Sequence, residues 1–327
     1  MKKILIIRFS SIGDIVLTTP VIRCLKTQLP DAEIHYLTKK QNHSLLQENP
    51  FLTRTWLYEN NFKELLPQLK AEQFDFVVDL HKNLRSLYVL FHLQKPSGTF
   101  QKLNLKKWMM VNLKIDRLPR IHIVDRYFAA VRSLGIANDR KGLDYFIPSG
   151  DEVDLSLLPE TFRHGFIACV IGGKHLTKIL PEDKVAEICH KISRPVVLLG
   201  GKEDVERGSR IEQLAGSSVF NACGRFSINQ SASLIRQADK VITNDTGLMH
   251  IAAAFGKNIL SVWGNTIPEF GMYPYLEGKE NAVSGIFEVK GLSCRPCSKI
   301  GFEKCPKGHF RCMKEQDTEA MILALNR

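Results

Sequence analysis

The feature that most constrains this fold is a regular alternation of short, β-rich apolar runs with longer stretches of helical spacing. The strand-like runs are 3–8, 33–38, 54–58, 74–80, 165–172, 195–201, 217–223, 240–245 and 258–264, and the clearest helical runs are 15–29, 62–72, 181–192, 228–238 and 247–256. Strands that alternate with helices favour parallel sheets covered on both faces. We therefore predict an α/β protein built from two doubly wound halves.

Length supports two domains, because 327 residues exceed one ordinary core and fit two domains of roughly 150 residues each. Pro, Gly and acidic residues interrupt the periodicity at 147–160. We place the boundary there and expect domains at 1–152 and 153–327. The last helix is expected either within the second domain or packed back on the first.

Charge is distributed unevenly between the halves. Residues 1–150 carry 23 Lys and Arg against 13 Asp and Glu, whereas residues 151–327 carry 22 against 21. A basic half implies an anionic partner, which at this stage is nucleic acid, a lipid headgroup or an acidic glycan. No apolar run approaches the ~20 residues that cross a bilayer, and the apolar stretch near the N-terminus is too short for a secretory signal. These features predict a cytoplasmic protein.

Two hydroxyls, a glycine and a carboxylate follow the first strand in "SSIGDIVLTTP". Gly13 would let a ligand approach the backbone closely, Ser11 is a candidate acceptor or cleft residue beside it, and Asp14 would accept a proton from a hydroxyl group. The alternative is that these residues only cap the next helix. Ligands of open parallel sheets bind at the carboxyl ends of strands, which is where this turn lies.

A second turn of this kind, "TNDTGLMHIAAAFG", follows the strand at 240–245. Asp245 and Thr246 stand at cap positions and Gly247 opens the backbone. Thr246 and His250 are four residues apart and share one helix face. Together with the helix N-terminus they predict a cradle for a diphosphate, while capping alone is the alternative.

Three loops add further candidates. Gly172 and Gly173 precede Lys178, which is placed to meet a phosphate, and "LLGGKEDVE" offers Glu203 to a ribose, with its two neighbours as competitors. The loop "DLHKNLRS" follows the strand at 74–80 and contains the candidate cleft residues His81, Asn83 and Arg85. A solvated surface loop is the alternative for each.

The segment "CRPCSKIGFEKCPKGHFRC" contains four thiols in a short stretch. We interpret Cys294, Cys297, Cys305 and Cys312 as a candidate tetrahedral zinc site of structural character. Reduced packing thiols or a labile disulfide are the alternatives. The remaining cysteines stand singly in core segments and are predicted to be reduced.

In this order, "SSIGD", "DLHKNLRS", "KILPEDK", "TNDTGLMHIAAAFGK" and "VWGNTIPEFG" resemble glycosyltransferase family 9, the ADP-heptose:lipopolysaccharide heptosyltransferases. The resemblance spans almost the whole chain. It implies a GT-B fold of two Rossmann-like domains facing a central cleft, with the acceptor on the first and the nucleotide sugar on the second. It also implies inverting transfer of a heptose-like sugar without a required metal cofactor.

The resemblance assigns the base to Asp14, the phosphate-facing lysine to Lys178, and donor binding to the turn from Asp245 through Thr246 and Gly247 to His250. Two positions depart from the family: Asn265 stands where "GPT" is usual, and Leu180 where an aromatic residue is usual. These departures bear on the specificity for the sugar and the nucleobase more than on the class of reaction.

The partners that follow are a nucleotide-sugar donor, a glycolipid acceptor and the anionic inner face of the cytoplasmic membrane. Residues 101–120 combine six basic residues with Trp108 and aliphatic residues, which suits a lipid headgroup layer. A core helix with a solvated basic face is the alternative. The competing functions are a nucleic-acid-binding protein with a zinc knuckle, and a family member that binds donor without turnover.

Overall fold

The computed structural model describes residues 2–327, whose contacts divide the chain into two compact units. The first unit consists of Met1–Lys102 and Ile121–Pro148, and the second consists of Leu103–Arg120 and Ser149–Arg327. The sequence placed one boundary at 152/153. The contacts instead place the main junction four residues earlier and assign an internal stretch of the first half to the second unit.

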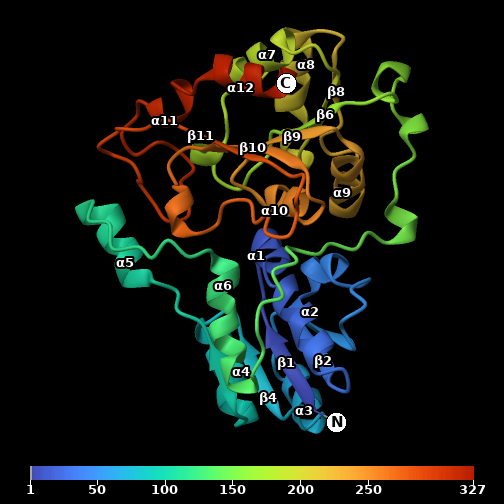
Figure 1. Cartoon of the computed structure of the whole chain (residues 1–327), viewed down its shortest axis with the longest axis vertical. Coiled ribbons are helices and arrows are strands. Elements are labelled where there is room, and N and C mark those ends of the chain that lie inside the picture. The colour runs from blue at the N-terminus through green and yellow to red at the C-terminus, as the bar shows by residue number, and fades with distance from the viewer. Residues whose placement is uncertain (1) are drawn as a thin grey trace. The chain divides into compact units, whose positions relative to one another are not determined.

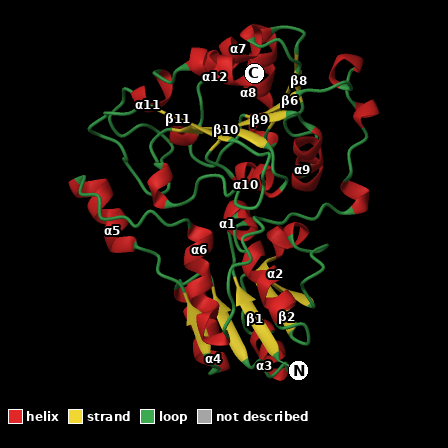
Figure 2. Cartoon of the chain, in the orientation of Figure 1, coloured by secondary structure: helices red, strands yellow, loops and turns green. Residues whose placement is uncertain are grey.

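The first unit contains a parallel sheet, whose strands Figure 2 draws in yellow around β1 and β2. Its strand order is β3-β2-β1-β4-β5. Its strands are β1 (Lys3–Ile7), β2 (Glu33–Lys39), β3 (Arg54–Tyr58), β4 (Phe76–Asp79) and β5 (Ser97–Thr99). The register pairs Ile7 of β1 with Asp79 of β4. The loops after β1 and β4 therefore leave the same edge of the sheet side by side.

Helices cover this sheet. They are α1 (Ile12–Val16), α2 (Thr19–Gln28), α3 (Leu65–Ala71), α4 (Leu84–Leu93) and α6 (Ile123–Tyr127), with 3₁₀ segments at Lys40–Leu45 and Phe128–Leu134. The single helix predicted at 15–29 is divided, and a proline lies in the first turn of α2, where its missing N–H costs nothing. Val89 and Leu93 of α4 pack against β1 residues in the core.

The second unit contains a parallel sheet with the order β11-β10-β9-β6-β7-β8. Its strands are β6 (Ile167–Val170), β7 (Val196–Leu199), β8 (Val219–Asn221), β9 (Lys240–Asn244), β10 (Asn258–Trp263) and β11 (Ser284–Glu288). β6 and β10 both pair with β9. The loops after these three strands thus share one edge.

Helices flank the second sheet on both faces, as Figure 1 shows for α7 and α10. They are α7 (Glu182–Lys191), α8 (Val205–Ala215), α9 (Ile228–Gln237), α10 (Gly247–Ala254), α11 (Arg311–Lys314) and α12 (Thr318–Asn326). Met321 and Leu325 of α12 join the core of this unit. The last helix therefore packs within the second unit, the first of the two positions that the sequence left open.

The segment Leu103–Arg120 also packs on the second unit, although it follows β5 of the first. It forms α5 (Asn104–Trp108) and a π-helical turn at Met109–Leu113. Leu118 is buried against Ile267 and Phe270, and the Lys107 ammonium lies 5.3 Å from the Phe270 ring centroid. The segment is therefore assigned to the second unit because a few of its apolar residues pack against residues far along the same chain.

Every predicted strand segment contains a strand, and two doubly wound parallel sheets confirm the predicted fold class. None of the helices formed by residues 2–327 combines the length and apolar character needed to cross a membrane.

Candidate active site

The turn after β1 brings Asp14 against a buried arginine that the sequence analysis did not single out. Arg8 Nη2 lies 2.7 Å from Asp14 Oδ1, and the Arg8 side chain also donates to the carbonyls of Ser10 and Leu80. Ser11 donates to Asp14 Oδ2 from its hydroxyl at 2.7 Å and from its N–H at 3.1 Å. Asp14 therefore closes a capping box, as the alternative interpretation expected, and in addition pairs with a cation.

These contacts set the charge state of Asp14. Burial raises the pKa of the carboxyl, but the Arg8 guanidinium and the hydrogen bonds from Ser11 outweigh it, so that the pKa lies below its usual range. The side chain keeps 21% of its surface exposed. Asp14 is thus an ionised carboxylate that an approaching hydroxyl group can reach.

Asp79, at the end of β4, organises the neighbouring loop. Its Oδ1 accepts from the N–H groups of His81 and Lys82 at 2.9 and 2.7 Å, and its Oδ2 accepts from the Ser86 hydroxyl at 2.8 Å. Burial together with the nearby positive charges of Arg8 and Lys102 lowers the pKa of His81 to about 3. The imidazole is therefore neutral at physiological pH and accepts or donates hydrogen bonds without carrying charge.

The other two residues predicted in this loop have different roles. Asn83 caps α4, since its Oδ1 accepts from the Ser86 N–H at 3.0 Å. Arg85 is exposed in the first turn of α4. The structure thus brings His81 to the sheet edge beside the Asp14 turn, engages Asn83 in capping, and leaves Arg85 available to an anion.

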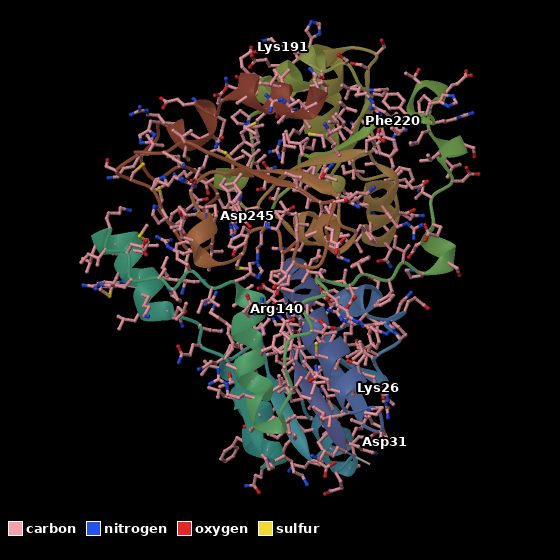
Figure 3. All side chains as sticks on the ribbon, viewed as in Figure 1. Lys26, Asp31, Arg140, Lys191, Phe220 and Asp245 are labelled. Carbon is pink, nitrogen blue, oxygen red and sulfur yellow. The ribbon has the colours of Figure 1, made fainter. Side chains whose placement is uncertain are left out.

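In the second unit, Lys178 and Asp245 form the centre of the predicted donor site. Lys178 Nζ lies 2.6 Å from Asp245 Oδ2, and the Thr266 hydroxyl donates to the same oxygen at 3.0 Å. The three residues follow β6, β9 and β10, so the shared edge of the sheet assembles them. Figure 3 labels Asp245 at this edge.

The N-terminus of α10 opens beside this pair. Thr246 is its N-cap residue, but the Thr246 side chain makes no capping hydrogen bond. The first N–H groups of a helix have no partner within the helix, and they attract anions. Gly247 begins the helix, and His250 is buried in its first turns.

Asn244, a residue that the sequence analysis overlooked, fixes this turn in place. Its Oδ1 accepts from the Leu180 N–H at 3.1 Å, and its Nδ2 lies 3.3–3.5 Å from three carbonyl oxygens of residues 170–172. The side chain is buried. Asn244 therefore ties the Lys178 loop to the strand that carries Asp245.

Of the three competing residues in the loop after β7, the structure separates Glu203 from Asp204. Asp204 is buried, accepts from the Gly201 N–H at 3.0 Å and pairs with Arg207 at 3.0 Å. A side chain at Gly172 would meet Asp204 at 2.4 Å, which explains the glycine. Glu203 is exposed, so it is the carboxylate of this pair that a ligand can reach.

Arg295, from the cysteine-rich segment, holds the loop after β10. Its Nε donates to the Gly264 carbonyl at 2.6 Å and its Nη2 donates to the Thr266 carbonyl at 2.9 Å. The same guanidinium pairs with Glu288 at 2.6 Å, and these two side chains are only 7% and 13% exposed. Arg295 therefore positions Thr266, the residue whose hydroxyl binds Asp245.

The cysteines of that segment do not assemble as predicted. Within residues 2–327, no three His, Cys, Asp or Glu side chains are grouped as a metal ion requires. Cys312 is buried in the apolar core, and the Cys297 thiol donates to the Cys294 carbonyl at 3.1 Å. Cys294 lies near His309, at 3.7 Å, and Cys305 is half-buried. The zinc interpretation thus lacks structural support, and the alternative of reduced packing thiols fits Cys312.

Comparison with known proteins decides the family. The family model described as "Glycosyltransferase family 9 (heptosyltransferase)" matches residues 63–298. The chain belongs to glycosyltransferase family 9. It is accordingly an enzyme that transfers glycosyl groups, which sets aside the nucleic-acid-binding alternative.

Curated relatives of this glycosyltransferase are similar over most of their length. Lipopolysaccharide heptosyltransferase 1 of Campylobacter coli is 25% identical over 291 residues, which cover 81% of this chain and 84% of that protein. Lipopolysaccharide heptosyltransferase 2 of Escherichia coli K12 is 25% identical over 297 residues, which cover 82% and 84%.

Solved structures of family 9 share the fold. The family 9 glycosyltransferase of Veillonella parvula has a TM-score of 0.70 at 21% identity, covering 87% of this chain and 86% of that one. The ADP-heptose lipopolysaccharide heptosyltransferase II of E. coli has a TM-score of 0.70 at 20% identity and covers 100% of both chains. The E. coli heptosyltransferase WaaC with ADP has a TM-score of 0.65 at 19% identity, covering 87% and 93%. The GT-B class predicted from sequence is thereby confirmed.

Proposed function

We propose that this glycosyltransferase moves a heptose-like sugar from ADP-heptose to a hydroxyl of the lipopolysaccharide core or a related glycolipid. The observation that carries the proposal is the Lys178–Asp245–Thr266 group beside the N-terminus of α10. The Lys178 ammonium, the Thr246 hydroxyl and the first N–H groups of α10 lie at one sheet edge, and together they suit a diphosphate. The relatives named as lipopolysaccharide heptosyltransferases support the choice of sugar and acceptor.

In the proposed reaction the acceptor hydroxyl attacks the anomeric carbon on the face opposite the diphosphate. The new C–O bond forms as the bond to the diphosphate breaks, which inverts the anomeric configuration. The acceptor proton passes to the Asp14 carboxylate. Lys178, the Thr246 hydroxyl and the Gly247 N–H meet the negative charge on the leaving diphosphate.

Arg8 has two effects on such a base. It keeps Asp14 ionised, and it also lowers the basicity of the carboxylate. The lower basicity is tolerable when the proton moves only as the C–O bond forms, because the attacking oxygen then becomes strongly acidic. We assign Ser11 and Gly13 to shaping the turn around Asp14. We assign His81 and Arg85 to contacting the acceptor. Asn83 orients the loop that contains these two residues.

On the donor side we assign Glu203 to the ribose and His250 to supporting the α10 turn. The reaction as proposed uses no metal cofactor, since cationic side chains and N–H groups meet the leaving-group charge. We place the enzyme in the cytoplasm, at the inner face of the membrane where a lipid-linked acceptor is presented, with the first unit serving the acceptor and the second unit serving the donor.

The test offers the enzyme ADP-heptose, and in parallel GDP and UDP sugars, together with glycolipid extracted from cells lacking core heptose. Mass spectrometry should show the gain of one heptosyl residue only with ADP-heptose, and EDTA should leave the rate unchanged. ADP binding without any transfer would instead support the alternative of a donor-binding member without turnover. Transfer from another nucleotide sugar would keep the reaction class and replace the donor.

A further inference from the structure

Helix α4 of the first unit is apolar on two faces, although it lies at the surface. One face buries Ser86, Val89 and Leu93. The other face exposes the apolar stripe, by which we mean Leu84, Leu87, Tyr88 and Phe91, exposed by 85, 51, 44 and 73%. These four positions follow the spacing i, i+3, i+4, i+7, so they form one continuous row on the helix. An exposed apolar row of this kind marks a binding surface.

The surroundings of the stripe are basic. From Leu80 to Lys102, the stretch of the first unit that contains α4, there are four Lys and Arg residues and no acidic residue. Lys82, just before α4, and Arg85, in its first turn, are exposed, and Lys95 follows the end of the helix. A row of Leu, Tyr and Phe with basic residues at both ends has the composition of a helix that lies in a lipid headgroup layer.

We infer that α4 docks on an anionic lipid surface, with Leu84, Leu87, Tyr88 and Phe91 inserted below the headgroups and the flanking basic residues on lipid phosphates. This inference deepens the proposed function, on which it rests for the identity of the lipid-linked acceptor. A short loop joins β4 to α4, and β4 pairs with β1, which leads to Asp14. A glycolipid whose acyl chains lie at α4 would therefore present its saccharide at the sheet edge that carries the base.

Charge distinguishes this partner from a second copy of the chain. A two-fold dimer would bring the same basic surface against itself, which is repulsive, whereas anionic lipid complements it. Protein interfaces also carry about one hydrogen bond per 100–200 Å². The Tyr88 hydroxyl is the one side-chain hydrogen-bonding group within the four-residue stripe. Insertion into a bilayer does not require hydrogen bonds from these side chains, because the lipid interior is itself apolar.

The test is sedimentation with vesicles of phosphatidylglycerol and phosphatidylcholine at low salt, compared with phosphatidylcholine alone. The wild-type protein should bind the anionic vesicles, and Leu87→Ser with Phe91→Ser should lower the partition coefficient roughly 100-fold, from the loss of two inserted side chains. The matched control is Leu214→Ser with Leu323→Ser, on exposed residues of the second unit. It should bind as the wild type does, and melting curves verify that both pairs fold.

A second arm separates this inference from the proposed transfer reaction. With ADP-heptose, the stripe variant should lose turnover on acylated acceptor in vesicles and keep turnover on the delipidated, water-soluble acceptor. No turnover by the wild type on either acceptor would refute the transfer, while stripe-dependent vesicle binding would still stand. Vesicle binding equal to wild type in the stripe variant would overturn the inference. The inference would also be overturned if the wild-type protein did not bind vesicles but formed a concentration-dependent dimer that the stripe variant could not form.

Discussion

The Arg8 guanidinium and the Asp14 carboxylate lie 2.7 Å apart at the end of β1, inside a turn where Ser11 holds the second carboxylate oxygen. Both oxygens of Asp14 are therefore engaged before any substrate arrives. The pair is a charge-assisted contact in a largely buried place, which fixes the carboxylate in one orientation. Its consequences can be measured in two ways.

The first prediction concerns Asp14→Asn. The variant should lose about 100-fold or more in turnover, the scale expected for a general base, while its affinity for ADP stays close to wild type. The reason is that the proposed reaction assigns Asp14 to the acceptor, whereas the residues that it assigns to the donor lie on the second unit. Steady-state rates measure the turnover, and calorimetry measures the affinity for ADP. Near-normal turnover would end the assignment of Asp14 as the base.

The second prediction concerns pH. Asp14 must be ionised to act, and its pKa lies below the usual range, so turnover should persist as the pH falls towards about 4, the range of an ordinary Asp. Arg8→Met leaves burial without the opposing cation, so the pKa of Asp14 should rise. The acid limb of the rate profile should then move to higher pH.

The same pair contributes to folding with a defined sign. A carboxyl whose pKa is lowered by folding stabilises the protein above the unfolded pKa, and this contribution is lost as the pH falls through the folded value. Denaturant titrations of Arg8→Met should therefore show a weaker loss of stability on acidification. An unshifted rate profile in this variant would mean that another group controls the acid limb.

The third prediction concerns the donor. Lys178→Met should weaken ADP binding by about tenfold to a hundredfold, the range for a lost charged hydrogen bond. Asp245→Ala and His250→Ala should also weaken it. Lys174→Met, a matched change on an exposed lysine of the same loop, should leave the affinity within about twofold. Calorimetry measures all four, and melting curves correct for a lost cap of about 1 kcal/mol. If all four variants bound ADP as tightly as the wild type does, the turn from Asp245 to His250 would have only a capping role.

The fourth prediction concerns Arg295. Arg295→Met strands the Glu288 carboxylate in a nearly closed environment and should lower the free energy of unfolding by about 3–5 kcal/mol. Adding Glu288→Gln removes the stranded charge and should restore much of that loss. Because the loop carbonyls of Gly264 and Thr266 stay without their donor, ADP affinity should remain reduced in the double variant. Recovery of both quantities together would contradict a positioning role for Arg295.

The fifth prediction concerns the segment 103–120, whose exposed Trp108 and Leu105 accompany basic residues. We expect Lys106→Glu with Arg117→Glu, or about 0.5 M salt, to reduce binding to anionic vesicles. Lys107 is left unchanged because it lies over Phe270 and serves the packing of the segment. Binding that salt weakens but the two substitutions leave unchanged would confine the lipid contact to the first unit.

Sequence predicted the larger part of the fold, because buried parallel strands are continuous apolar runs that stand out against helical spacing. It missed β5 and β11, which are edge strands: β5 spans only Ser97–Thr99, and β11 contains two residues of low β-propensity in Ser284 and Gly285. Such strands owe their pairing to a neighbour already in place, and a local pattern does not contain that information.

The site was predicted to a similar degree and for a similar reason. Asp14, Lys178 and Asp245 follow strands, where the rule of carboxyl ends points to ligands. Arg8 and Arg295 were missed because their roles depend on partners up to about seventy residues away, at Leu80 for Arg8. A signal for Arg8 existed, since an arginine at the end of a buried strand requires a partner.

The excursion of residues 103–120 makes the chain pass between its two units three times, near 102/103, 120/121 and 148/149. The units are therefore not consecutive in the gene, although each has its own core. A fragment that begins at Ser149 would lack Leu118 and leave Ile267 and Phe270 uncovered. To express the second unit by itself, residues 103–120 would have to be joined to residues 149–327 through a linker. An evolutionary exchange of either unit would likewise have to include this segment with the second unit.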